Sequence, residues 1–201
     1  MSKKENYRPR TRLVHDGQNR SPFGETSEAL YLTSGFVYDS AEQAEARFRE
    51  EDDGYIYSRF GNPTVRMFEE RMMALERAED ARATATGMAA VTAAMLSLLQ
   101  AGDHVVASRA LFGSCRYIVE TLLPRYGIET TMVDGRDTDA WGQAMRPTTK
   151  VMFLETPSNP VLEVIDMQAV ADIAHAHGAR LVVDNVFATP ILQRPLDFGA
   201  D

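Results

Sequence analysis

The chain has 201 residues, of which 44% are hydrophobic, so it can bury the core of one domain or of a domain and part of another. Its formal net charge of -8 argues against a general nucleic-acid binder, because such proteins normally present a basic face. The single cysteine, Cys115, excludes a disulfide framework within the chain, and no apolar run is long enough for a membrane span or a secretory signal. We therefore expect a cytoplasmic protein.

The first part of the chain is irregular. Residues 1 to about 39 carry turn signals and no sustained hydrophobic period. Disorder is one interpretation and an extended arm is the other, which residues 30–32 and 36–38 favour because they are too apolar for a solvated tail. A capping box at Ser40 then predicts a helix over about 41–51, and Asn62 followed by proline predicts the start of a helix over about 64–78.

From residue 82 onward, short runs of β character alternate with helix-like segments. The expected strands cover residues 82–86, 104–107, 128–133, 150–155 and 180–184. The expected helices cover residues 88–100, 113–126, 139–145 and 167–177. Alternation at this spacing predicts an α/β fold, with a mostly parallel sheet, helices on both faces and right-handed crossovers.

The residues that follow the expected strands are candidates for a binding site, because such sheets bind ligands beyond the carboxyl ends of their strands. Gly87 opens a helix after the first strand, and Phe112, Asn159 and Asp184 follow later ones. Asp184 ends an apolar run, and a carboxylate there is costly to bury without a partner. We therefore expect a functional role for Asp184.

Each of the other candidates has two interpretations. Gly87 either allows tight helix–strand packing or leaves backbone N–H groups free for a phosphate. Phe112 is either a core side chain or a platform for a cofactor ring, and Asn159 is either a turn residue or a ligand contact.

Other ligand classes fit less well. A nucleotide hydrolase and a dinucleotide-binding protein are minor alternatives, because the chain has no GxxxxGK[ST] loop and TGMAA at 86–90 is not GxGxxG. No metal site is expected, since His175 and His177 are two residues apart on a helix and point to different faces.

Several separated motifs, in order, resemble one family. They are YSR at 57–59, GNPT at 61–64, TGMAA at 86–90, ETPSNP at 155–160, AVADIAHAHGA at 169–179 and VVDNVFATPILQRPLDFGAD at 182–201. From about Thr33 to Asp201 the chain resembles the enzymes of cysteine and methionine metabolism that depend on pyridoxal phosphate (PLP). They include cystathionine γ-synthase, cystathionine lyases, methionine γ-lyase and O-acyl-homoserine sulfhydrylases.

The resemblance implies PLP as cofactor and the aspartate-aminotransferase-like large domain of fold type I, here truncated. It implies that Gly87 and Met88 give backbone N–H groups to the cofactor phosphate. Phe112 is expected to stack on the pyridine ring and Asn159 to contact its phenolic oxygen. Asp184 is expected to keep the ring nitrogen protonated, because an opposite charge favours the charged form.

The resemblance also implies an assembly of subunits. Tyr57 and Arg59 are expected to reach the phosphate of a neighbouring subunit's cofactor, with the guanidinium as a bidentate clamp. Residues 1–60 then form an extended arm that contributes to the neighbour, and residues 61–201 form the first part of the PLP-binding domain. The expected assembly is a homotetramer built from two dimers.

Two positions depart from the family pattern. Phe112 stands where most members carry tyrosine, so it keeps the stacking and lacks the hydroxyl used for proton transfer; phenylalanine here resembles the O-succinylhomoserine sulfhydrylase branch. Methionine γ-lyases have cysteine two places after the aromatic, where this chain has Ser114. We therefore expect the next residue, Cys115, to be a small buried thiol.

The lysine that forms the Schiff base with PLP follows the GAD motif in the family. The lysines of this chain are Lys3, Lys4 and Lys150, and none of them fits that role. We expect a partial chain whose Schiff-base lysine lies beyond Asp201, with Phe112 and Asp184 as the catalytic residues that it contains.

The expected activity of the full-length protein is γ-replacement on O-succinylhomoserine with sulfide to give homocysteine, in methionine biosynthesis. The alternatives within the family are a cystathionine γ-synthase, a cystathionine lyase and a methionine γ-lyase. The alternative from another class is a non-catalytic piece that lacks the lysine.

Overall fold

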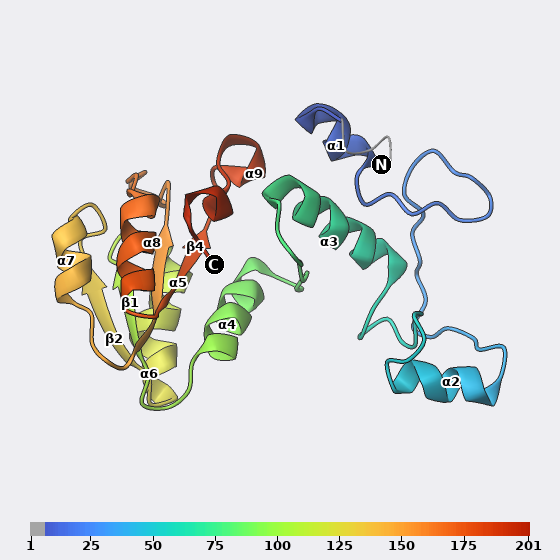
Figure 1. Ribbon diagram of the computed structural model, residues 1–201, viewed down its shortest axis with the longest axis horizontal. Helices are drawn as coiled ribbons and strands as arrows, with labels where there is room; N and C mark the ends of the chain where they lie inside the picture. The colour runs from blue at the N-terminus through green and yellow to red at the C-terminus, as the bar shows by residue number, and fades with distance from the viewer. Residues whose placement is uncertain (1–6) are drawn as a thin grey trace. The chain divides into compact units, whose positions relative to one another are not determined.

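The computed structural model describes residues 7–201 (Figure 1). Lys3 and Lys4 lie outside the described residues. The chain divides between Ala83 and Thr84 into two compact units, and each is described by itself. Among residues 7–201, no helix has the length and apolar character that crossing a membrane requires.

The first unit contains three helices in its described part: α1 (Pro9–His15), α2 (Ala41–Phe48) and α3 (Pro63–Glu76). The predicted caps of the two longer ones are confirmed. The side chain of Ser40 accepts from the N–H of Gln43, and that of Asn62 accepts from the N–H of Thr64. Their sequence-based boundaries were two to three residues too long at the carboxyl end, where helices fray.

Helix α1 was not predicted from the sequence. Contacts with α3 hold the chain at its carboxyl end. Gly17, just past α1, has φ +70 and lies against the backbone of α3, where a Cβ atom would come within 2.4 Å of the Met67 carbonyl oxygen. Arg71 of α3 donates from Nε to the carbonyl of Asp16 at 3.0 Å and pairs with Glu28. Elsewhere before α2, the described chain is irregular, with turns, bends and a single bridge from Gly35 to Tyr57.

The second unit is built on a parallel sheet of four strands in the order β2-β1-β3-β4. The strands are β1 (His104–Ser108), β2 (Glu129–Val133), β3 (Thr149–Glu155) and β4 (Arg180–Asp184). The main helices are α4 (Gly87–Leu98), α5 (Gly113–Tyr117), α7 (Thr138–Gln143) and α8 (Met167–Ala176). Two short turns of helix, α9 (Thr189–Leu192) and η3 (Pro195–Phe198), follow β4 and were not predicted.

The helix predicted over 113–126 is interrupted. α5 continues as a π-helical segment, η2 (Ile118–Leu122), and then as α6 (Leu123–Arg125). The wider turn ends two residues before Pro124, which has no N–H to continue the regular ladder.

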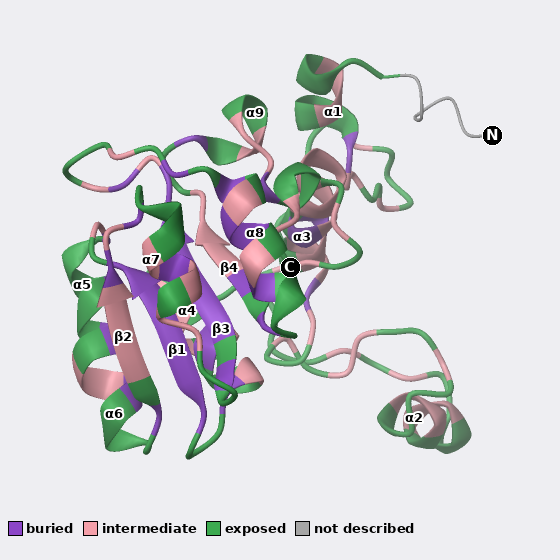
Figure 2. Ribbon diagram, turned by 60° about the vertical axis from the view of Figure 1, so that its left-hand side comes forward, coloured by how far each residue is buried: buried purple, intermediate pink, exposed green. Residues whose placement is uncertain are grey.

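Side chains of the sheet alternate between two cores, as the period of two in a strand requires. Val105 and Phe153 face one core with α4, α5, η2 and α6, whereas Met152 and Leu154 face the other with α7 and α8. Figure 2 shows the central strands β1 and β3 almost wholly buried and the edge strand β2 less so. The predicted parallel sheet with helices on both faces is therefore confirmed.

The expected strand at residues 82–86 is wrong. Within the described residues this segment is exposed and belongs to no sheet. Its side chains are arginine, alanine and threonine, which bury little apolar area. The N–H of Ala83 donates instead to the carboxylate of Glu69 on α3, at 2.8 Å.

Candidate functional site

Two acidic side chains end neighbouring strands at the carboxyl edge of the sheet. β3 ends at Glu155 and β4 at Asp184, and these two residues are partners in the parallel register. Because side chains alternate along a strand, Glu155 lies on the same face as Phe153, and Asp184 on the same face as Val182. That face is covered by α4 and α5.

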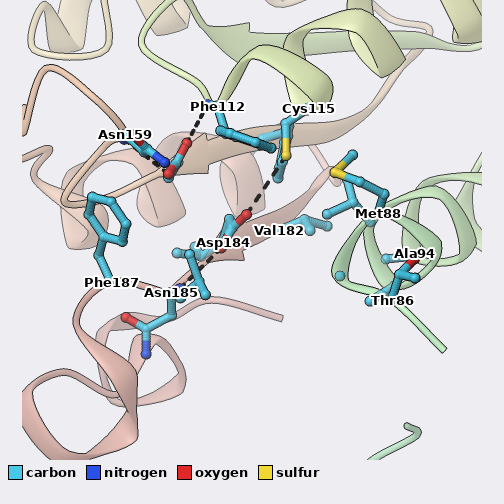
Figure 3. Close-up of a pocket in the computed structure, with 17 residues that line it drawn as sticks. Thr86, Met88, Ala94, Phe112, Cys115, Asn159, Val182, Asp184, Asn185 and Phe187 are labelled. Atoms are coloured by element: carbon cyan, nitrogen blue, oxygen red, sulfur yellow. Dashed lines mark hydrogen bonds between the residues drawn. The ribbon is translucent and has the colours of Figure 1, made fainter. Parts of the chain in front are cut away.

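A cavity of about 610 Å³ opens at this edge, and all the residues that line it belong to the second unit. It brings together five of the residues singled out in the sequence: Gly87, Met88, Phe112, Asn159 and Asp184. Most of its remaining wall is apolar, with Val91, Phe153, Val182 and Phe187 among its lining residues. Figure 3 shows Met88 and Thr86 on one side of Asp184, and Phe112 and Asn159 on the other.

The amino end of α4 forms one end of the cavity. The side chain of Thr86 caps the helix by accepting from the N–H of Ala89 at 3.1 Å. Within residues 7–201, the N–H groups of Gly87 and Met88 meet no protein acceptor, so they are available to an anion. A Cβ atom on Gly87 would meet no other heavy atom within 4 Å, so tight packing does not explain this glycine.

Phe112 and Asn159 lie at the opposite part of the cavity. The Phe112 side chain is 41% exposed, so it is not a core residue. The loop after β3 that carries Asn159 is braced by Ser158, whose N–H donates to the Glu163 carbonyl at 3.0 Å and whose hydroxyl accepts from the Glu163 N–H at 3.1 Å. Thr156 adds a bond from the Ile165 N–H to its hydroxyl, at 3.0 Å.

Glu155 holds these two parts together. One of its oxygens accepts from the backbone N–H of Phe112 at 2.6 Å, and the other from the backbone N–H of Asn159 at 3.0 Å. The residue is 1% exposed, and burial raises the pKa of its carboxyl. No role was predicted for Glu155, although it ends a buried apolar strand in the same way as Asp184.

Asp184 is partly exposed at the floor of the cavity. One of its oxygens accepts from the N–H of Val186 at 3.1 Å, and the other faces the thiol of Cys115 at 3.8 Å (Figure 3). A thiol is a weak donor, so this second oxygen can still accept a strong bond from a positively charged N–H group.

Cys115 is the small buried thiol that the sequence predicted, with 1% of its surface exposed. Burial, with a smaller contribution from the charge of Asp184, raises the pKa of the Cys115 thiol to about 12. The thiol is therefore neutral near pH 7 and is a poor nucleophile.

Tyr57 and Arg59 belong to the first unit, where both are exposed. The guanidinium of Arg59 lies 5.4 Å from the ring centroid of Tyr57 and 5.1 Å from that of Phe60. Lys150 is exposed near the amino end of β3, at the edge of the sheet opposite the cavity.

Comparison with known proteins identifies the family. The model of the family described as "Cys/Met metabolism PLP-dependent enzyme" matches residues 10–201. The chain belongs to this family. Its cofactor is pyridoxal 5'-phosphate.

Relatives include an O-succinylhomoserine sulfhydrylase of Mycobacterium tuberculosis, which is 53% identical over 94% of this chain and 46% of its own length. The sulfhydrylase of the same name from Pseudomonas aeruginosa is 51% identical over 95% of this chain and 47% of its own length. The chain thus spans about half the length of the curated relatives it matches.

Among solved structures, the chain is similar to a putative O-acetylhomoserine (thiol)-lyase of Campylobacter jejuni, with a TM-score of 0.93 and 31% identity. The likeness covers 98% of this chain and 49% of that one, which contains an N'-pyridoxyl-lysine-5'-monophosphate group. The predicted fold, the large domain of fold type I, is confirmed over the part that this chain spans.

The cavity residues fit PLP. The free N–H groups of Gly87 and Met88 suit a phosphate, and the apolar walls suit a flat aromatic ring. A carboxylate oxygen of Asp184 suits a protonated ring nitrogen, because an opposite charge favours the charged form.

Proposed function

We propose that the full-length protein is an O-succinylhomoserine sulfhydrylase, which replaces the succinyloxy group on the γ-carbon of O-succinylhomoserine with sulfide, giving homocysteine and releasing succinate. The observation that carries the proposal is the single cavity lined by Gly87, Met88, Phe112, Asn159 and Asp184. The relatives at 53% and 51% identity, both named O-succinylhomoserine sulfhydrylase, favour this substrate over others in the family.

Each cavity residue has a task toward the cofactor, which supplies an electron sink for negative charge developing on the substrate. The N–H groups of Gly87 and Met88 bind the phosphate, and the ring of Phe112 stacks on the pyridine ring. The side-chain amide of Asn159 binds the phenolic oxygen. Asp184 accepts from the ring N–H and holds the proton on that nitrogen.

Phe112 has no hydroxyl, so it orients the ring and moves no proton. In our proposal proton transfer at the substrate falls to the lysine that binds PLP, supplied by sequence beyond Asp201. The exposed position of Lys150 at the amino edge of the sheet supports this assignment.

The protein is proposed to work as a homo-oligomer, in which Tyr57 and Arg59 bind the cofactor phosphate of a neighbouring subunit. The exposure of both side chains favours this role. A homotetramer in the cytoplasm stays a prediction.

A methionine γ-lyase is the second candidate, because a relative of that name from Treponema denticola is 42% identical over 95% of this chain. One assay separates the candidates. Purified full-length protein is given O-succinylhomoserine with sulfide, O-succinylhomoserine with cysteine, or methionine alone, and the products are identified.

We expect homocysteine from the first mixture as the fastest reaction. Faster formation of cystathionine from the second contradicts the proposal and indicates a synthase, and release of a keto acid from methionine indicates a lyase. PLP added to the 201-residue chain alone is expected to give no absorbance of a cofactor bound to an active-site lysine. A strong signal that Lys150→Ala abolishes would contradict our assignment of the lysine.

A further inference from the structure

Glu155 is the most deeply buried charged group of the cavity. It is 1% exposed at the end of β3, where apolar residues precede it. Among residues 7–201, the groups that act on this carboxyl are two backbone N–H groups and the like charge of Asp184, with no basic side chain among them. A buried carboxyl without such a partner is costly to fold, so its contacts need an explanation.

Those contacts are two backbone N–H groups from separate parts of the chain. The Phe112 N–H, which donates at 2.6 Å, belongs to the residue that precedes α5. The Asn159 N–H, which donates at 3.0 Å, belongs to the loop after β3. A carboxylate has two acceptor oxygens, so one side chain can hold both segments, which no apolar or amide residue of this size can do.

The two segments are the ones that carry the proposed contacts to the cofactor ring. Phe112 provides the stacking surface and Asn159 the amide for the phenolic oxygen. Glu155 is also the partner of Asp184 in the strand register. The proposed contacts of Phe112, Asn159 and Asp184 to the cofactor therefore all depend on two neighbouring positions of the sheet.

We propose that Glu155 is a positioning residue for PLP. Its carboxylate fixes the backbone of Phe112 and of Asn159, and so sets the ring platform and the ring-oxygen contact relative to Asp184. This inference rests on the proposed roles of Phe112 and Asn159 and adds a residue to that site.

The test uses the full-length apoprotein titrated with PLP. Protein fluorescence gives the dissociation constant, and visible circular dichroism at saturation reports how the ring is held. Glu155→Gln keeps the size of the side chain but has one acceptor oxygen, and its NH₂ group faces a backbone donor. We expect the dissociation constant to rise about tenfold and the visible dichroism to weaken.

Two further variants serve as comparisons. Glu155→Asp keeps both acceptor oxygens on a shorter stem, and it is expected to recover part of the affinity and part of the dichroism. Glu129→Gln is the control, because Glu129 is an exposed carboxylate at the amino end of β2. It is expected to leave both measurements unchanged.

A purely structural role would lower the melting temperature of Glu155→Gln and leave the PLP measurements as in the wild type. A folded Glu155→Gln protein with wild-type affinity and dichroism therefore overturns the proposal. Where that variant does not fold, Glu155→Asp decides: unchanged affinity and dichroism overturn the proposal, and a loss in either supports it.

Failure of the underlying site is recognised separately. Asn159→Ala removes the amide side chain and keeps the backbone N–H that Glu155 holds. Wild-type PLP binding by Asn159→Ala contradicts the proposed site itself, whereas weaker binding there with no effect of Glu155→Gln contradicts only the positioning role.

Discussion

The carboxyl of Glu155 links the site to the pH dependence of stability. Burial raises its pKa above the usual value of 4.5, the N–H groups of Phe112 and Asn159 act in the opposite direction, and the charge of Asp184 raises it further. The folded protein therefore keeps the proton on Glu155 to a higher pH than the unfolded chain does. As pH rises from 4.5 through the folded pKa, the folded state loses stability from this group.

Glu155→Gln removes this pH-dependent loss. We expect the stability of the wild-type apoprotein to fall relative to the variant as pH rises above 4.5, and the difference to level off above the folded pKa. Urea unfolding at a series of pH values measures it, with Glu129→Gln as the control that follows the wild type. A difference that is independent of pH, or that grows in the other direction, contradicts the argument.

At the residue scale, the sequence predicted only part of the candidate site. A charge ending an apolar strand singled out Asp184, and the same rule applied to residues 151–154 would have singled out Glu155. The hydrogen-bond partners of Glu155 could not be predicted from the sequence. Phe112 lies 43 residues away, and only the folded sheet brings the two residues together. Gly87 was open to two interpretations until the structure placed empty space around it.

At the scale of elements, one residue at the start of α4 both stabilises the helix and lines the cavity. Thr86 accepts from the N–H of Ala89 and lines the cavity. We expect Thr86→Ala to lower the free energy of unfolding by about 1 kcal/mol, since a lost N-cap leaves a helix donor without a partner. Thr86→Ser keeps the cap oxygen and is expected to retain most of the stability. Chemical denaturation that finds the two variants equally stable contradicts this prediction.

Helices that begin with a side-chain N-cap were predicted well. The helix predicted over 167–177 is an example, since Asp166 caps α8 by accepting from the N–H of Ala169. The N-cap of α1, Arg8, makes no side-chain cap bond, so the proline at its first position, Pro9, was the one start signal that this seven-residue helix offered. The error at 82–86 has another cause, because a strand needs a neighbour to pair with and local sequence does not specify one.

At the scale of the whole molecule, the proposed roles of Tyr57 and Arg59 require sites shared between subunits. Full-length Arg59→Ala and Asp184→Ala proteins are each expected to be inactive. In a mixed dimer one of the two sites receives both intact residues, so random re-assembly should restore roughly a quarter of wild-type activity.

The control is a mixture of Asn159→Ala and Asp184→Ala. Both changes fall on the cavity of a single subunit, so no mixed dimer gains an intact site and activity should stay absent. Absence of recovery in the Arg59 and Asp184 mixture, when mixed dimers are present, counts against shared sites.

The strand order β2-β1-β3-β4 also has a consequence for how the second unit folds. The central pair, β1 and β3, is not consecutive: His104 meets Thr149, 45 residues later, while β2 forms an edge. Closing so long a segment has an entropic cost before any pairing energy is gained. We expect the pairing of β1 with β3 to limit the folding rate. On a ribosome, Glu155 and Phe112 then meet only after β3 has emerged, so the proposed cofactor site forms no earlier than the pairing of β1 with β3.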